Sequence, residues 1–240
     1  MTNELTRCLL ISLAVSSAVS ASGDNWPNWR GPNGDGVSSD KNLPLNWSDK
    51  ENVRWRVDLP GPGNSSPIVW GDRVFVSQYV EKDNRRTLMC LDRASGKVLW
   101  QSGINYANRE PTQENNPYLW KLDRVKSGMG SGVIHGGDFY TISSDGIAVC
   151  LDLSTGKTVW EERLKGPGAR GTSWSSMLLA GDKIYVPNQS GDSFVLRASP
   201  KFEVLATNSV GEPTNASLAA SNDELFLRTD KALWCFANPK

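Results

Sequence analysis

Two stretches of the chain, LDRASGKVLW at residues 91–100 and LDLSTGKTVW at residues 151–160, are copies of one run. They share Leu, Asp, Gly, Lys and Trp at the same places, and an apolar residue precedes each Trp. Internal similarity of this kind is typical of folds built from repeated supersecondary units. The fold should therefore be worked out from this repeat outward.

A second landmark surrounds the copies. A Gly-Asp or Asn-Asp pair followed by alternating apolar residues occurs at residues 71–76, 137–140, 181–186 and 222–227. Glycine tolerates the positive φ of a tight hairpin turn, and alternating apolar residues predict a strand. The last three pairs lie about 40 residues apart, close to the period of one propeller blade.

Each unit is predicted to form four strands, which in the first unit span residues 65–70, 74–78, 88–92 and 97–101, with a turn at 93–96. The third unit has a degenerate turn at 198–201, with Leu205 in place of the Trp. The fourth unit ends after its third strand, and residues 52–57 are predicted to be a lone fourth strand. The predicted units lie near 46–60, 62–104, 126–165, 169–210 and 212–240.

One such sheet cannot bury both of its faces, so neighbouring units must stack. Radial stacking gives an all-β propeller of four-stranded blades, whereas the rungs of a β-solenoid are usually much shorter than this unit. Closed propellers have roughly four to eight blades. The chain contains three nearly full units and two partial ones, so we predict a partial propeller of about four to five blades.

The irregular place is residues 105–126, where 105–112 is predicted to be a polar loop and 119–123 the tail of a blade without its earlier strands. Blades are therefore expected to be missing at this point. Three outcomes stay open: an open arc, a small closed ring, or half of a ring that a homo-oligomer closes.

Residues 1–21 are predicted to be a signal peptide, with Arg7 before an apolar stretch and a small-x-small site at Val19-Ser20-Ala21. The apolar stretch is short of the roughly 20 residues that cross a bilayer. The expectation is export to the periplasm or the cell exterior, with no transmembrane span once the peptide is removed. Residues 22–45 are then an N-terminal extension, and residues 46–240 hold the repeats.

Composition excludes some classes of function. Twenty-six basic and 26 acidic residues balance, which argues against a nucleic-acid partner. His135 is the only histidine, which weakens any histidine-based metal site or proton relay. Cys90, Cys150 and Cys235 remain after export, and we interpret them as buried apolar residues in strands.

The repeated run resembles the docking motif of the pyrroloquinoline-quinone-like (PQQ-like) β-propeller family, a WD40/YVTN-like quinoprotein fold. The opening run WPNWRGPNGDG at residues 26–36 resembles exported planctomycete-type members. Those are labelled barrel-assembly-factor-like or polyvinyl-alcohol-dehydrogenase-like. The resemblance covers nearly all of the chain after residue 21.

The resemblance implies a quinone site only for the dehydrogenases of the family. These hold the quinone between a Trp and two adjacent cysteines, beside calcium and a catalytic Asp. This chain has no Cys-Cys pair and no Cys-x-x-Cys-His haem motif. No catalytic residue, metal ligand or cofactor is therefore assigned, and PQQ and calcium have no supporting residues.

The loops that lead into the first strands should form the mouth of the channel. Binding candidates there are Asn64, Ser65, Ser131, Trp174, Ser175, Asn215 and Ser217. They could form a shallow hydrogen-bonding site for a ligand or peptide with Trp174 as an aromatic platform, or be small only because the channel is narrow. The repeat residues are interpreted as structural: Asp92, Gly96, Trp100, Asp152, Gly156 and Trp160.

Two functions remain. The first is an exported, non-catalytic scaffold or binding protein with a protein or peptide partner, similar to outer-membrane assembly proteins. The alternative is a PQQ-dependent alcohol dehydrogenase-like oxidoreductase or a degenerate relative. Fold does not choose between them.

Overall fold

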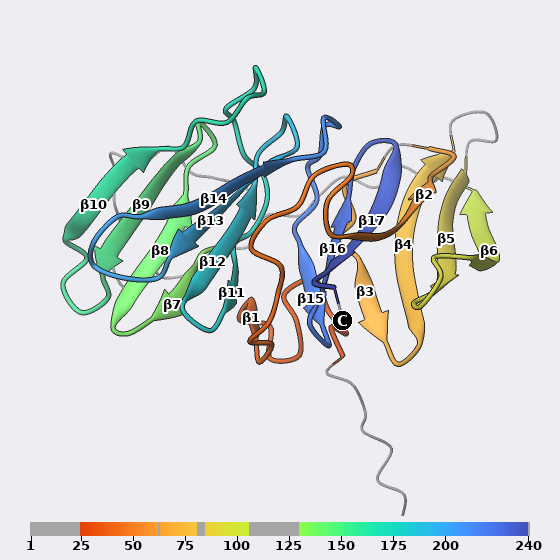
Figure 1. The fold of residues 1–240 in the computed structure, drawn as a ribbon, viewed down its shortest axis with the longest axis horizontal. Coiled ribbons are helices and arrows are strands. Elements are labelled where there is room, and N and C mark those ends of the chain that lie inside the picture. The colour runs from red at the N-terminus through yellow and green to blue at the C-terminus, as the bar shows by residue number, and fades with distance from the viewer. Residues whose placement is uncertain (1–24, 62, 81–84, 106–129, 240) are drawn as a thin grey trace, which may run out of the picture.

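The structure is a computed structural model that describes residues 25–61, 63–80, 85–105 and 130–239. The predicted signal peptide, residues 1–21, and the predicted blade tail, residues 119–123, lie outside these ranges. The described residues form strands β1 to β17 and no helix (Figure 1). They contain no apolar helix of bilayer-spanning length. The all-β prediction is confirmed.

The strands form four sheets, which we number as blades along the chain. Blade 1 has β3 (Ile68–Trp70), β4 (Arg73–Val80), β5 (Arg85–Asp92) and β6 (Val98–Asn105). Blade 2 has β7 (Val133–His135), β8 (Asp138–Ile142), β9 (Ile147–Asp152) and β10 (Thr158–Arg163). Blade 3 has β11 (Leu178–Ala180), β12 (Lys183–Pro187), β13 (Asp192–Arg197) and β14 (Val204–Ser209). Blade 4 has β15 (Ala219–Ser221), β16 (Glu224–Arg228), β17 (Ala232–Ala237) and β2 (Val53–Asp58).

Blade 4 is assembled from both ends of the repeat region. Strand β2 pairs antiparallel with β17, so that Trp55 lies opposite Cys235. The partial units predicted near 46–60 and 212–240 are thus two parts of one blade. The N-terminal extension also contributes a strand, because β1 (Val37–Ser38) pairs in parallel with β11 at the inner edge of blade 3.

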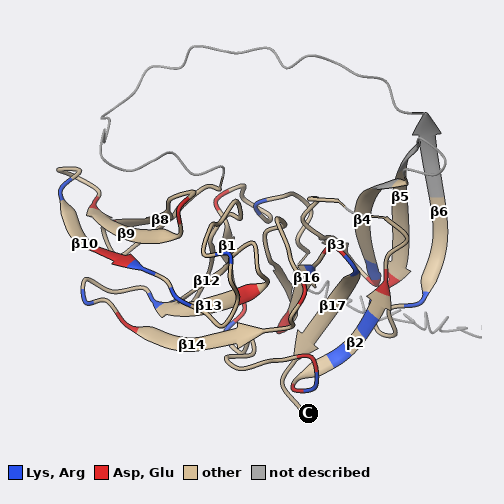
Figure 2. Cartoon of the chain, turned by 90° about the horizontal axis from the view of Figure 1, so that it is seen from above, with Lys and Arg blue, Asp and Glu red and all other residues tan. Residues whose placement is uncertain are grey.

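The blades do not follow one another in space as they do in sequence. Figure 1 shows them in the order blade 2, blade 3, blade 4, blade 1, and Figure 2 shows this arc from above. Blades 1 and 2 are consecutive in the chain, yet they lie at opposite ends of the arc. The described residues of a single chain therefore form an open arc rather than a small closed ring, and the predicted partial propeller is confirmed.

Blades 1, 2 and 4 share one internal design. The repeat cysteine of the third strand lies opposite the repeat tryptophan of the fourth, in the pairs Cys90–Trp100, Cys150–Trp160 and Cys235–Trp55. All three thiols are free and buried. Burial raises the pKa of Cys150 to about 11 and that of Cys235 to about 12, so these thiols stay neutral and pack as apolar groups.

Candidate functional site

Serines at the channel mouth join each blade to the next. The backbone N–H of Ser131 donates to Ser176 Oγ at 2.9 Å. The N–H of Ser176 donates to Ser217 Oγ at 2.8 Å, and that of Ser217 to Ser66 Oγ at 3.2 Å. This serine series runs from blade 2 through blades 3 and 4 to blade 1, so these hydroxyls are used as structural acceptors.

Two predicted mouth serines lie one position away from the series. Ser65 Oγ donates to Ser77 O at 2.9 Å within blade 1, and Ser175 Oγ donates to Ala216 O at 2.9 Å. Their neighbours Ser66 and Ser176 accept the bonds between blades. The sequence signal was present, since both positions are serine. Ser175 Oγ also bonds the following blade, whereas Ser65 Oγ bonds within its own blade.

Amide side chains form a second series across the same mouth. Gln189 Nε2 donates to Asn215 Oδ1 at 2.7 Å, and Asn215 Nδ2 donates to Asn64 Oδ1 at 3.2 Å. The structure thus brings the predicted residues Asn64 and Asn215 together. Gln189, which the sequence did not single out, extends the series into blade 3.

Trp174 is the exposed aromatic residue of this mouth, with 40% of its surface accessible. Two positions earlier in the chain, Thr172 O accepts the backbone N–H of Gln189 at 2.8 Å. Gln189 also lines a surface pocket of about 420 Å³ between the strand connections of blade 3. The pocket is lined by Pro167, Gly168, Ala169, Arg170, Gln189, Ser190, Asp192, Ser209, Gly211 and Pro213.

One carboxylate in this pocket is fully buried. Asp192 Oδ2 accepts the N–H of Gly168 at 2.9 Å and Nδ2 of Asn188 at 3.1 Å. Its Oδ1 has no hydrogen-bond partner among the described residues. The pocket therefore presents amide, hydroxyl and backbone groups around one buried carboxylate.

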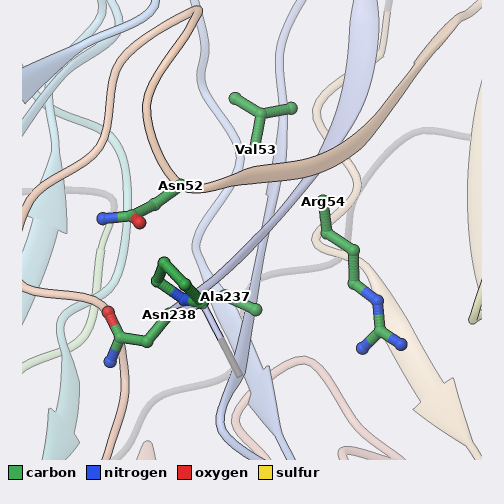
Figure 3. Close-up of a pocket in the computed structure, with 6 residues that line it drawn as sticks. Asn52, Val53, Arg54, Ala237 and Asn238 are labelled. Carbon is green, nitrogen blue, oxygen red and sulfur yellow. The ribbon is translucent and has the colours of Figure 1, made fainter.

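A second pocket of about 420 Å³ lies where β2 and β17 close blade 4 (Figure 3). Its only charged side chain, Arg54, is paired with Glu224, and Asn238 Nδ2 donates to Asn42 O at 2.9 Å. Its polar groups hold the chain ends together.

The repeated aspartates cap their own turns. Asp92 Oδ1 accepts the N–H of Ser95 at 2.9 Å, and Asp152 Oδ1 accepts the N–H of Thr155 at 2.8 Å. Hydroxyl donors add to both, from Ser95 at 2.7 Å and from Ser154 at 2.7 Å. These bonds, the Ser154 hydroxyl first, lower the pKa of Asp152 to about 2.

This pKa predicts a pH effect. The carboxylate of Asp152 stabilises the fold above its unfolded pKa of about 3.9, and this stabilisation is lost as the pH falls toward 2. Asp152→Asn should therefore lower the urea midpoint at neutral pH, and the difference from the parent chain should shrink between pH 4 and pH 2. Asp49→Asn, at an exposed carboxylate outside the repeat turns, is the control and should show no such convergence. A pH-independent difference for Asp152→Asn would contradict the assignment.

The repeat tryptophans dock on the next blade. Trp55 of blade 4 donates from Nε1 to Arg93 O in the β5–β6 turn of blade 1, at 2.8 Å. Trp160 of blade 2 donates to Ser199 O in the β13–β14 turn of blade 3, at 3.1 Å, and packs edge-on against Phe202. Trp100 of blade 1 has no described acceptor and is 46% exposed, so this docking is missing at one end of the arc.

The described residues do not fit a quinone site of the dehydrogenase kind. Cys90, Cys150 and Cys235 lie in three different sheets and cannot form an adjacent pair. No three His, Cys, Asp or Glu side chains converge anywhere in the described part of the chain. No chemical step is therefore derived through PQQ or calcium.

Solved structures match this chain at low identity and low TM-score. A europium-containing methanol dehydrogenase is 15% identical over 77% of this chain and 31% of its own, with a TM-score of 0.30. BamB from Moraxella catarrhalis is 15% identical over 73% of this chain and 58% of its own, with a TM-score of 0.35. The computationally designed Ika8 protein is 9% identical over 72% of this chain and 45% of its own, with a TM-score of 0.36.

The chain thus spans less than two thirds of each of these structures. No curated protein matches it significantly. The family model described as "Outer membrane protein assembly factor BamB" matches residues 37–112 and 83–217, which together make up most of the chain. With its repeated run and its four-stranded blades, the chain belongs to this family of PQQ-like β-propeller repeats.

Proposed function

We propose that this chain is an exported, non-catalytic propeller protein that binds a protein or peptide partner at its channel mouth. The observation that carries the proposal is the composition of that mouth. Its serines and amides are bonded between blades, and Trp174 is exposed in the loop that leads into β11. An exposed aromatic residue with amide and backbone groups suits an extended peptide, because the indole packs on an apolar side chain while polar groups pair with its backbone.

The family and the N-terminus support the setting. The family's description refers to outer-membrane protein assembly, and residues 1–21 have the pattern of a signal peptide. We therefore place the protein in the periplasm or outside the cell, acting on other proteins. Mass spectrometry of the exported protein should give an N-terminus at Ser22.

The binding test uses a synthetic ten-residue peptide of alternating aromatic and hydroxyl side chains, titrated by fluorescence anisotropy. Saturable binding is expected, and Trp174→Ala should weaken it by about tenfold, as loss of one aromatic contact does. Trp29→Ala is the matched control, because Trp29 is similarly exposed but lies in the N-terminal extension. Equal effects of the two variants on peptide binding would show that the peptide does not bind at the channel mouth.

A catalytic test distinguishes the proposed binding protein from the alternative, a PQQ-dependent dehydrogenase. Chain incubated with PQQ and calcium is expected to bind no chromophore and to reduce no dye when an alcohol is added. Saturable quinone binding with alcohol-dependent dye reduction would overturn the non-catalytic assignment.

A further inference from the structure

One face of blade 1 is open where the other blades are covered. On the face that carries the repeat cysteine, the second-strand aromatic residue is at most 1% exposed in blades 2 to 4, at Tyr140, Tyr185 and Phe226. In blade 1 the corresponding Phe75 is only half-buried. Register places Trp70, Leu88 and Trp100 on this same face, and all three are exposed. The open face of blade 1 is therefore an apolar blade face without its neighbour.

Blade 2 also has exposed apolar residues, on the face opposite to the one that carries its repeat cysteine. The central residue of the first strand is at most 3% exposed in the other blades, at Val69, Leu179 and Ala220. At the same place in blade 2, Ile134 is 53% exposed. Leu153, in the β9–β10 turn, is 36% exposed. A preceding blade would cover both residues.

The turn of blade 2 repeats the turn on which Trp55 docks. Gly96 in blade 1 has φ +73° and Gly156 in blade 2 has φ +67°. At Gly96 a Cβ would lie 2.7 Å from the Trp55 ring, so the missing side chain makes room for the indole. The repeat therefore supplies a second tryptophan seat at residues 152–157, with the carbonyl of Leu153 in the place of the Arg93 carbonyl.

The serine series also stops at both ends of the arc. Each step joins a backbone N–H to the hydroxyl of the following blade. Ser131 Oγ at the start receives no donor from the described residues, and the N–H of Ser66 at the end has no acceptor among them. One more blade junction would join these two groups by the same rule.

We infer that a second copy of this chain supplies that junction, so that blade 1 of each copy packs on blade 2 of the other. Trp100 would then occupy the seat at residues 152–157 of the partner copy. Two arcs of four blades give a ring of eight, within the range that closed propellers adopt. A two-fold axis makes both junctions identical and leaves no open end. The repeated turn and the undocked tryptophan are both on this chain, which is why the occupant is a second copy.

The inference rests on the proposed function only in that a closed ring completes the mouth at which the partner binds. Its test is the mass of the exported chain by light scattering, which should be that of a dimer. Trp100→Glu and Leu153→Lys should each weaken the dimer by about 100-fold, because each buries an unpaired charge at the centre of both junctions. Both positions are exposed within one chain, so unchanged urea midpoints of the dissociated variants serve as the folding control.

Mixing the Trp100→Glu and Leu153→Lys variants gives a more specific test of the junction. A mixed dimer has one junction with both native residues and one in which the introduced carboxylate faces the introduced ammonium, so dimer should return when the variants are combined. Trp29→Ala, at a similarly exposed tryptophan in the N-terminal extension, should leave the dimer intact.

Several outcomes would overturn the inference: a monomeric parent chain at high micromolar concentration, or two dissociated variants that fail to restore a dimer on mixing. A monomer that still binds the peptide through Trp174 would remove the second copy and keep the proposed function. A dimer that oxidises alcohol with bound quinone would keep the second copy and overturn the proposed non-catalytic function.

Discussion

Replacing Trp55 by alanine is expected to destabilise the folded chain by about 3–5 kcal/mol, the usual cost of truncating a buried tryptophan. Trp55 is 8% exposed and lies on β2, the strand that completes blade 4. Its ring packs 6.1 Å from that of Phe226, and its Nε1 bonds to the Arg93 carbonyl of blade 1. The substitution would therefore leave a cavity between two blades and an unpaired carbonyl.

Trp100 provides the matched control, because it is the same residue at the same place in the repeat. Its ring lies 6.1 Å from that of Phe75, the same separation as in the pair Trp55–Phe226. The geometry inside the blade is thus equal, and only the docking on a following blade differs. Trp100→Ala, made in the Leu153→Lys background to keep the chain monomeric, should cost less than about 1 kcal/mol.

Urea unfolding followed by circular dichroism measures both free energies. A large cost for Trp55→Ala with a small one for Trp100→Ala would place the energy of the repeat tryptophan between blades. Equal costs would place it inside each blade, against the neighbouring aromatic ring, and would contradict the docking assignment.

The repeat made much of this fold predictable from sequence. The Asp-x-Ser/Thr-Gly turn specifies its own hydrogen bonds locally, since Asp92 and Asp152 each cap residues three positions away. Alternating apolar residues specified the strands, and the hairpin glycines specified their turns. These signals are contained within one unit and need no knowledge of its neighbours.

Contacts between units were not predictable in the same way. The pairing of β2 with β17 joins segments at opposite ends of the repeats. The sequence predicted a lone fourth strand and a unit without one, but it did not predict that the two pair. Strand β1 has two residues, too few for a periodic pattern. The choice of Ser66 over Ser65 as acceptor depends on the backbone N–H of Ser217 in another blade, which no local pattern specifies.

An ion pair between blades was missed for a related reason. Arg93 occupies a variable position of the repeat, where the second copy has Leu153. In the structure Arg93 Nε lies 2.6 Å from Glu224 Oε2, both side chains are buried, and Glu224 also pairs with Arg54. Arg93 donates further to the carbonyl of Ser221. The network joins blade 1 to blade 4, and within blade 4 it joins β16 to β2.

Glu224→Gln is therefore expected to destabilise the chain by about 3–5 kcal/mol, because it leaves the buried guanidinium of Arg93 without its counter-charge. Glutamine keeps the shape of the side chain, so the loss reports charge rather than packing. Glu203→Gln is the matched control: Arg197 Nε lies 2.7 Å from Glu203 Oε2, but both side chains are exposed. Its expected cost is at most about 1 kcal/mol.

The pair of variants separates burial from geometry, since the two ion pairs use the same atoms at nearly the same distance. Urea unfolding at neutral pH gives both free energies, and added salt should reduce the small cost at Glu203 while leaving the large cost at Glu224 nearly unchanged. Equal, salt-sensitive costs would mean that water reaches Arg93 and that its ion pair with Glu224 contributes little to the junction of blades 1 and 4. A large, salt-insensitive cost at Glu224 would instead mean that its carboxylate joins blade 4 to blade 1 through Arg93 and holds β2 in blade 4 through Arg54. Within one chain the blades are held only at such junctions, so each junction needs strong contacts of its own.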